Sequence, residues 1–364
     1  MTIKAKTLFD PSLEKDNCGF GLIAQRNGKR SRKLVKKSIL GLTSMTHRGA
    51  IGADGKTGDG CGLLFDLNHS FFKFKVAGEL DVKLPDFFAV AQLFHRNDLD
   101  FYYSSIRKFL NSQDLDIAVT RSVPVNNEVL GKIARQNLPN ISQVFITSKN
   151  TNLNKERFEA CLLQARKFIE EKFDNDEEFY VCSMSTQTIV YKGLMLPSAI
   201  DQFYLDLKDK KFEAKICLFH QRFSTNTLPR WHLAQPFRLL AHNGEINAIR
   251  GNRNWAKARK SKFSTALIPE ITTFKNLVNE KGSDSSALDN MIEILVKGGI
   301  NTFRALRMVL PPAWQNIHMM DPEIKSFHEY NSMHMEAWDG PAGIVMSDGR
   351  WAICLLDRNG LRPA

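Results

Sequence analysis

The apolar residues of this chain occur only in short stretches. The longest strongly apolar stretch covers residues 87–94 (FFAVAQLF), whereas a helix needs about 20 apolar residues to cross a bilayer. We therefore expect no membrane span. Glycine and proline are scattered instead of being pooled in a linker, and no repeat period is visible. This distribution argues for one continuous domain.

Composition places the chain among globular proteins. Of its 364 residues, 43% are apolar and 24% are charged, which is typical of a folded chain. Residues 1–17 lack the apolar core that a secretory signal needs. The six cysteines are widely spaced and form no CxxC motif, so they do not indicate a disulfide scaffold. We expect a cytoplasmic location, with most thiols as small buried apolar groups.

The formal net charge of +11 raises the question of a nucleic-acid partner. Basic residues cluster in the segments 26–37 and 250–262, and such clusters can track phosphates. They are more often solvated faces or subunit contacts, and no zinc-finger, homeodomain or RRM signature accompanies them. We therefore expect no nucleic-acid binding.

Local patterns predict several strands and helices. A strand over residues 18–25 precedes the turn signal Asn27-Gly28, and further strands are predicted within 179–191, 215–219 and 237–241. Apolar residues at helical spacing predict helices over 35–45, 158–173 and 287–296. The first helix is followed by His47-Arg48-Gly49, where Gly49 is placed to adopt a left-handed conformation.

The last part of the chain predicts a hairpin. Its two strands lie on either side of Asp348-Gly349, a type I′ turn signal. Asn359-Gly360 starts another turn shortly before the last residue. This turn predicts a further strand that the sequence does not contain. We therefore expect a piece of a longer polypeptide.

Two cysteines are candidates for a nucleophile. Cys18 stands at the start of a strand, and removal of residues 1–17 would give it a free α-amine with a pKa of about 7.7–8.0, which suits a base. A structural role is the commoner one for a cysteine near the N-terminus. Cys61 lies in a glycine-rich segment that lacks the P-loop order and predicts a tight turn, so its role stays open. The others are expected to pack in a helix or in strands: Cys161, Cys182, Cys217 and Cys354.

Three polar segments are candidates for substrate contacts. Residues 220–227 (HQRFSTNT) gather a guanidinium, hydroxyls and amides at a strand end, which suits capture of a small carboxylate, although a self-satisfied polar loop is an equal alternative. The dipeptide Asn243-Gly244 favours a hairpin turn, with an oxyanion hole as the alternative. Asp284 lies near the start of a predicted helix, where the helix dipole favours an ionised carboxylate.

Taken together, the motifs resemble the N-terminal glutamine amidotransferase domains of the large (α) subunits of bacterial glutamate synthases. The resemblance runs from about Leu8 to the last residue, with many long motifs in the same order. It is carried by CGFGLIAQ, MTHRGAIGADGKTGDGCGLLF, CLFHQRFSTNT, LAHNGEINAIRGNRNW, GSDSSALDNMIEILVKGG, MVLPPAWQN and EAWDGPAGIVMSDGRW.

This resemblance implies a fold and a maturation step. The fold is α+β, a four-layer αββα sandwich of two antiparallel sheets of the N-terminal-nucleophile hydrolase type. Residues 1–17 would be a propeptide removed on maturation, and 18–364 would be a C-terminally incomplete type-2 amidotransferase domain. Cys18 is the implied nucleophile.

The resemblance also assigns the remaining site residues. Asn243 and Gly244 would form the oxyanion hole. Arg222, with Thr225 beside it, would bind the α-carboxylate of glutamine, Asp284 would meet its α-ammonium, and Arg48 would lie near the pocket. The implied reaction is hydrolysis of L-glutamine to L-glutamate and ammonia through a cysteinyl thioester. No metal or cofactor is expected in this chain.

In the parent enzyme that the resemblance implies, an oxidoreductase, the ammonia forms glutamate from 2-oxoglutarate. That reaction would use FMN and a 3Fe–4S cluster in a synthase domain absent from this chain, with NADPH electrons arriving through a small (β) subunit. Alternatives are an amidotransferase domain of another synthase and a catalytically silent fragment or interaction module that retains the fold.

Overall fold

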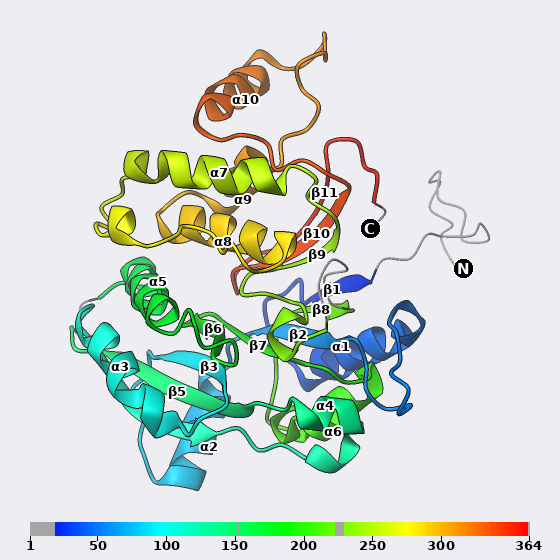
Figure 1. The fold of residues 1–364 in the computed structure, drawn as a ribbon, viewed down its shortest axis with the longest axis vertical. Helices are drawn as coiled ribbons and strands as arrows, with labels where there is room; N and C mark the ends of the chain where they lie inside the picture. Colours follow the sequence, from blue (N-terminus) through cyan, green and yellow to red (C-terminus); the bar gives the residue numbers. More distant parts are fainter. Residues whose placement is uncertain (1–18, 151–152, 223–228, 363–364) are drawn as a thin grey trace.

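The computed structural model describes residues 19–150, 153–222 and 229–362 (Figure 1). Within them the strands form three sheets, and all strand pairs are antiparallel. The first sheet has the order β1 (Phe20–Ala24), β8 (Ile216–Gln221), β2 (Cys61–Asp66) and β7 (Thr188–Gly193). The second has the order β11 (Ala352–Leu356), β10 (Ala342–Ser347) and β9 (Leu240–Gly244). The third has the order β4 (Leu115–Ser122), β5 (Asn140–Ser148), β3 (Ala89–His95) and β6 (Tyr180–Ser185).

The helices surround these sheets. They are α1 (Arg32–Ser44), α2 (His69–Leu80), α3 (Leu99–Asn111), α4 (Lys132–Gln136), α5 (Lys155–Lys172), α6 (Ile200–Phe203), α7 (Ile249–Arg259), α8 (Asp284–Lys297), α9 (Thr302–Val309) and α10 (Pro322–His334). α5 and α8 confirm the helices predicted over 158–173 and 287–296. No helix in the described ranges is long and apolar enough to span a membrane.

Alternation along β2 shows why the first sheet is covered on both faces. Leu63 and Phe65 join the apolar cluster that includes residues of α1. Leu64, between them in sequence, joins a cluster with Ala241 of β9 and Val345 of β10. Because successive side chains of a strand point to opposite faces, α1 covers one face of this sheet and the second sheet covers the other.

The second sheet repeats this pattern on its own faces. Val345 packs toward the first sheet, whereas Ile344 and Met346 join a cluster with Leu288 and Met291 of α8. Residues of α9 belong to the same cluster. Figure 1 shows α7, α8 and α9 on the side of β9, β10 and β11 that faces away from α1.

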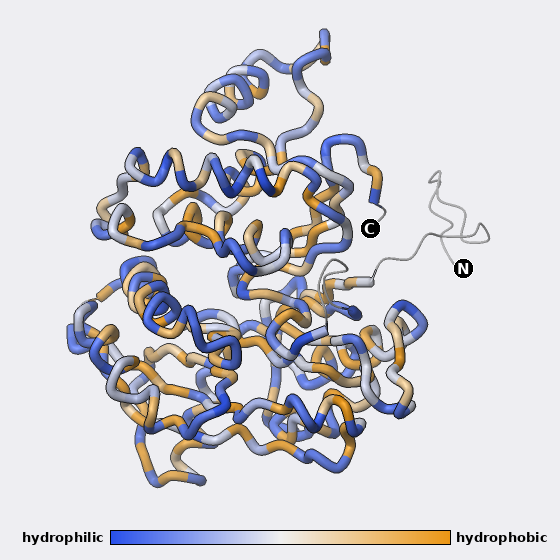
Figure 2. Tube along the Cα trace, in the orientation of Figure 1, coloured by the Kyte–Doolittle hydropathy of each residue, from blue (hydrophilic) through white to orange (hydrophobic). Residues whose placement is uncertain are grey.

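The third sheet extends the expected architecture, which contained two sheets. One of its faces contributes Val90 and Phe145 to the cluster that α1 shares, and the other packs Ala91 and Val144 against α3 and α5. Figure 2 shows apolar residues along the strands and a mainly hydrophilic α7. β3 comes from the longest apolar stretch of the chain, which a strand buried on both faces requires.

The C-terminal hairpin forms, but with a different turn from the predicted one. Ser347 pairs with Ala352, so four residues connect β10 and β11 instead of two. Gly349 has a φ of 82°, and the Asp348 carboxylate accepts the backbone N–H groups of Arg350 at 2.9 Å and Trp351 at 2.8 Å. The type I′ prediction is wrong because the Asp348 side chain closes a longer loop.

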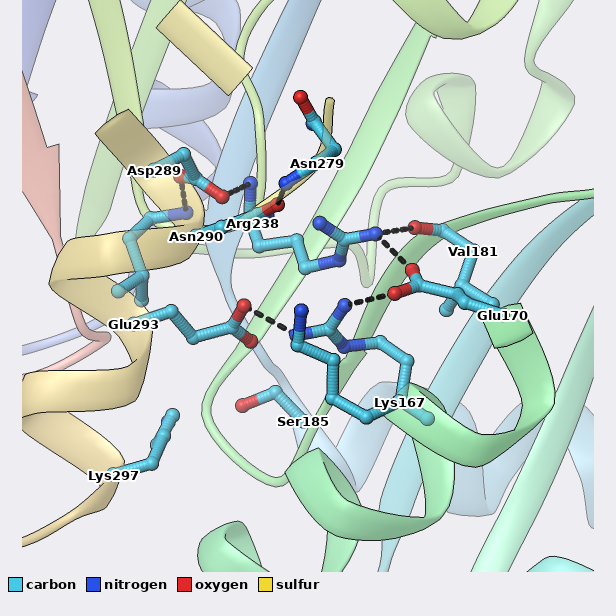
Figure 3. Close-up of polar contacts among 12 residues, drawn as sticks. Lys167, Glu170, Val181, Ser185, Arg238, Asn279, Asp289, Asn290, Glu293 and Lys297 are labelled. Carbon is cyan, nitrogen blue, oxygen red and sulfur yellow. Dashed lines mark hydrogen bonds and ion pairs between the residues drawn. The ribbon is translucent and has the colours of Figure 1, made fainter. Parts of the chain in front are cut away.

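A buried ionic network joins α5 to α8 and to the segment before β9 (Figure 3). The Arg166 guanidinium contacts Glu170 at 2.7 Å and also contacts Glu293 of α8. Arg238 contacts Glu170 and donates to the Val181 carbonyl oxygen at 3.0 Å. The Arg166 side chain is only 1% exposed, so its charge depends on these partners.

Removal of Arg166 is expected to destabilise the domain strongly. The variant Arg166→Met leaves Glu293 buried without its cation, and breaking such a pair costs about 3–5 kcal/mol. The control is Arg96→Met, since the Arg96 and Glu178 side chains are 69% and 46% exposed and such pairs contribute at most about 1 kcal/mol. Urea unfolding measures both, and equal losses would contradict the prediction.

Candidate active site

Three strand ends meet at one edge of the first sheet. His220 of β8 pairs with Phe20 of β1, and the backbone N–H of Gln221 donates to the Gly19 carbonyl oxygen at 2.7 Å. On the other side, the N–H of Arg222 donates to the Gly60 carbonyl oxygen at 2.7 Å. The end of β8 is therefore clamped between the segments that enter β1 and β2. Cys18 and Thr225, two predicted site residues, lie outside the described residues.

Arg222 has an unusual backbone conformation. Its φ is 99°, in the left-handed region that residues other than glycine rarely adopt. Its N–H is held by Gly60, and its carbonyl oxygen accepts a hydrogen bond from Nδ1 of His220 at 2.8 Å. Burial lowers the pKa of His220 to about 4, so this ring is neutral at pH 7. The half-exposed Arg222 side chain has its Nε 3.5 Å from Oδ2 of Asp59.

The HRG segment packs against the same edge. Arg48 ends the 3₁₀ helix η1 (Thr46–Arg48) and is exposed. Gly49 has a φ of −101°, so the predicted left-handed conformation is wrong. A Cβ at Gly49 would lie 1.9 Å from Nε2 of Gln221 and 2.8 Å from Oδ1 of Asp59. Glycine is favoured here because a side chain would displace the Gln221 and Asp59 side chains at the end of β8, not because the residue caps a helix.

Asn243 and Gly244 end β9 and do not form a hairpin turn. They pair with Gly343 and Ala342 of β10, so the turn interpretation of this dipeptide is wrong. Gly244 has a φ of 143°, and a Cβ there would lie 1.8 Å from the Pro341 carbonyl oxygen. This conformation belongs to glycine alone.

Asp284 begins α8, as predicted, and its carboxylate reaches back to the segment after β9. Oδ2 accepts the backbone N–H of Ile246 at 2.8 Å, and Oδ1 accepts that of Ser285 at 2.7 Å. Ser283 caps the helix by accepting the N–H of Ser286 at 3.1 Å. The Asp284 carboxylate is therefore bound to the backbone two residues after Gly244.

Two histidines connect the edge of the first sheet to β9. His220 lies two residues before Arg222, and its ring interacts with a backbone group of His242. His242 directly precedes Asn243, and its Nδ1 lies 2.7 Å from Oγ of Ser285 in α8. The structure therefore brings the strands that carry Arg222 and Asn243 together with the start of α8.

Sequence reasoning did not identify several residues that hold this arrangement. Asp289 of α8 accepts the backbone N–H groups of Leu239 at 2.9 Å and Leu240 at 3.2 Å, which fixes the start of β9. Asp59, His220 and His242 were also missed. The histidines had a signal, since each lies one or two residues from a predicted site residue.

Four described cysteines are unsuited to nucleophilic attack. Cys61, Cys161, Cys182 and Cys217 are buried, and burial raises the pKa of each thiol. The Cys61 thiol donates to the Met195 carbonyl oxygen at 3.4 Å, so its open role resolves as packing. The prediction that Cys354 packs is wrong: it is exposed because β11 is the last strand of its sheet.

Comparison with known families identifies the family of this chain. The family model described as "Glutamine amidotransferases class-II" matches residues 18–364. The chain belongs to the class II glutamine amidotransferases. This match confirms the resemblance found in the sequence motifs.

Individual relatives of this amidotransferase are glutamate synthases. It is 39% identical over 367 residues to the large chain of glutamate synthase (NADPH) from Bacillus subtilis (strain 168), covering 99% of this chain and 24% of the relative. It is 37% identical over 371 residues to glutamate synthase (NADH) from Saccharomyces cerevisiae, covering 98% and 17%. With the ferredoxin-dependent glutamate synthase of Cyanidium caldarium, identity is 39% over 371 residues, covering 96% and 23%. The chain thus spans about a quarter or less of these relatives.

Replacement of Gly244 by alanine is expected to destabilise this amidotransferase domain. The backbone conformation alone costs a residue with a side chain about 1–3 kcal/mol, and the clash with Pro341 adds to that. The control is Gly251→Ala in α7, where a Cβ meets nothing within 4 Å and alanine is favoured by about 0.5–1 kcal/mol. Urea unfolding measures both variants. A Gly244→Ala protein as stable as the unsubstituted chain would contradict the described conformation.

Proposed function

We propose that this domain hydrolyses L-glutamine to L-glutamate and ammonia through a thioester on Cys18. The observation that carries the proposal is the meeting of three segments: the start of β1, which begins two residues after Cys18, the end of β8 next to Arg222, and β9 with the start of α8. The family match begins at residue 18, which supports residues 1–17 as a propeptide and Cys18 as the first residue of the mature domain.

The amino-acid end of glutamine binds to groups of both signs. Arg222 and Thr225 take the α-carboxylate, and Asp284 takes the α-ammonium, with Arg48 near the pocket. The half exposure of Arg222 supports this role, because its guanidinium is accessible to a ligand. Fixing both ends of the amino-acid group makes attack on the side-chain amide effectively intramolecular.

The reaction itself uses one residue as nucleophile and base. The free α-amine of Cys18 takes the thiol proton, directly or through a water, and the thiolate attacks the amide carbon. The oxyanion is stabilised by the Asn243 side-chain amide and the Gly244 backbone N–H. Ammonia leaves with the proton, and water then hydrolyses the thioester to glutamate.

We also propose that the layer order of α1, first sheet, second sheet and α8 with α9 is the αββα sandwich of N-terminal-nucleophile hydrolases. The clusters on both faces of each sheet support this proposal. The third sheet and its helices would then be an addition beside the sandwich.

The proposal extends to the larger enzyme. There the ammonia forms glutamate from 2-oxoglutarate, with FMN, a 3Fe–4S cluster and electrons delivered through a small subunit. The chain covers 17–24% of the glutamate synthases that it matches, and we assign these groups to the parts of such an enzyme outside the matched region. The names of the relatives include NADPH, NADH and ferredoxin, although this chain matches them about equally well. We therefore propose that the electron donor is determined by other domains of the enzyme.

Loss of an oxyanion donor tests the assigned roles. The variant Asn243→Ala is expected to lower the kcat of glutamine hydrolysis about a hundredfold or more, because one such donor contributes about 2.7–4 kcal/mol, while KM changes little. Ammonia release measures the rate, with Cys18→Ala as the inactive reference. A normal kcat in Asn243→Ala would reject the oxyanion assignment, and an inactive unsubstituted chain with mature Cys18 would favour the silent module.

Processing gives a second test. Before cleavage the Cys18 nitrogen is an amide and cannot accept a proton, so the uncleaved chain is expected to be nearly inactive. Intact-mass measurement of active protein should show Cys18 as the first residue. Full activity in a chain that still begins at Met1 would contradict the mechanism.

A further inference from the structure

Asp59 is a buried carboxylate at the edge of the proposed glutamine site. The residue is 6% exposed. Neither carboxylate oxygen makes a hydrogen bond of good geometry to the described residues, although the backbone N–H groups of Ala50 and of Asp59 itself lie near enough to favour the charged form. Its ion-pair partner is Arg222, whose Nε lies 3.5 Å from Oδ2. Burial raises the pKa of Asp59, against the opposing effects of the Ala50 backbone and the Arg222 charge. A carboxylate in such a place needs an explanation.

The tight turn predicted for this glycine-rich segment does not supply one. Another carboxylate closes that loop: Asp54 accepts hydrogen bonds from the backbone N–H of Thr57 at 2.8 Å and from its hydroxyl at 2.6 Å. Asp54 also accepts the N–H of Ile133 at 3.1 Å. Asp59, by contrast, points its charge at the end of β8.

Asp59 contacts the guanidinium of Arg222 at Nε. Arginine has five N–H donors in a planar fork. The closest approach of Asp59 is to Nε, at 3.5 Å, so the end of the guanidinium formed by the two terminal nitrogens can face a second carboxylate. A pair of terminal N–H groups matches a carboxylate bidentately. The backbone of Arg222 is held by Gly60, the residue after Asp59, so one turn sets both the main chain and the side chain.

We propose that Asp59 is a positioning residue that orients the Arg222 guanidinium so that its terminal nitrogens face the α-carboxylate of glutamine. This inference rests on the proposed function, because it requires that Arg222 receives that carboxylate. Asp59 does not touch the substrate in this role. Its effect is therefore confined to ligands that carry an α-carboxylate.

The variant Asp59→Asn is expected to raise KM for L-glutamine about tenfold, as for a lost charge-assisted contact, with kcat changed less than about twofold. The selective readout compares two competitive inhibitors of the full chain, L-glutamate and γ-aminobutyrate, which lacks the α-carboxylate. The inhibition constant of L-glutamate is expected to rise about tenfold, and that of γ-aminobutyrate to stay within about twofold.

Three further variants separate the possible outcomes. Asp54→Asn is the matched control, since it removes a carboxylate from the same segment and is expected to lower stability without changing the ratio of the two inhibition constants. Arg222→Ala is expected to abolish the preference for L-glutamate. Adding Asp59→Asn to Arg222→Ala is expected to change nothing more, because the two residues act as a unit. If Asp59→Asn does not fold, the two inhibition constants are measured with Asp59→Ser instead.

The two levels of the argument fail differently. An unchanged preference for L-glutamate in Arg222→Ala would overturn the proposed binding role of Arg222. If Arg222→Ala loses that preference but Asp59→Asn weakens both inhibitors equally, or neither, the positioning role of Asp59 is overturned and the proposed function stands.

Discussion

The face-to-face packing of the first two sheets determines where the functional groups of this domain lie. β8 and β9 belong to different sheets and share no strand ladder, so side chains between the sheets bring their ends together. These side chains are Phe20, Leu64, Val190, Leu218, Ala241 and Val345. Full burial of a large apolar side chain contributes about 1.5–3 kcal/mol. The same packing holds the end of β8, next to Arg222, close to the end of β9 at Asn243.

α8 adds a second constraint by holding β9 along its length. Asp289 binds the backbone before the strand, His242 contacts Ser285 within it, and Asp284 binds the N–H of Ile246 after it. One helix thus positions the backbone on both sides of Asn243. Rigid support of this kind suits the proposed oxyanion role of Asn243, because the donors of such a site must already lie where charge develops.

The sequence predicted those features of the fold that depend on local pattern. Apolar periodicity located α5 and α8, and the motifs identified the family. The hairpin turn predicted from Asn243-Gly244 was wrong, because the dipeptide indicates only a local turn preference. The strand partner of Asn243 is Gly343, which lies far away in sequence. Apolar periodicity carries no information on the buried charge of Arg166, because its partner Glu293 lies on α8, which packs against α5. Gly49 is explained by neighbours that no local pattern contains.

The chemistry of Arg222 shows why an arginine suits this position better than a lysine. The side chain has a buried carboxylate on one side and, in the proposed reaction, a substrate carboxylate on the other. A lysine has one strongly hydrated nitrogen, so contact with Asp59 would compete with contact to the substrate. A guanidinium presents separate N–H groups in fixed directions and can serve both. The left-handed backbone of Arg222 is consistent with this demand, because strain of that kind persists only where surrounding contacts hold it.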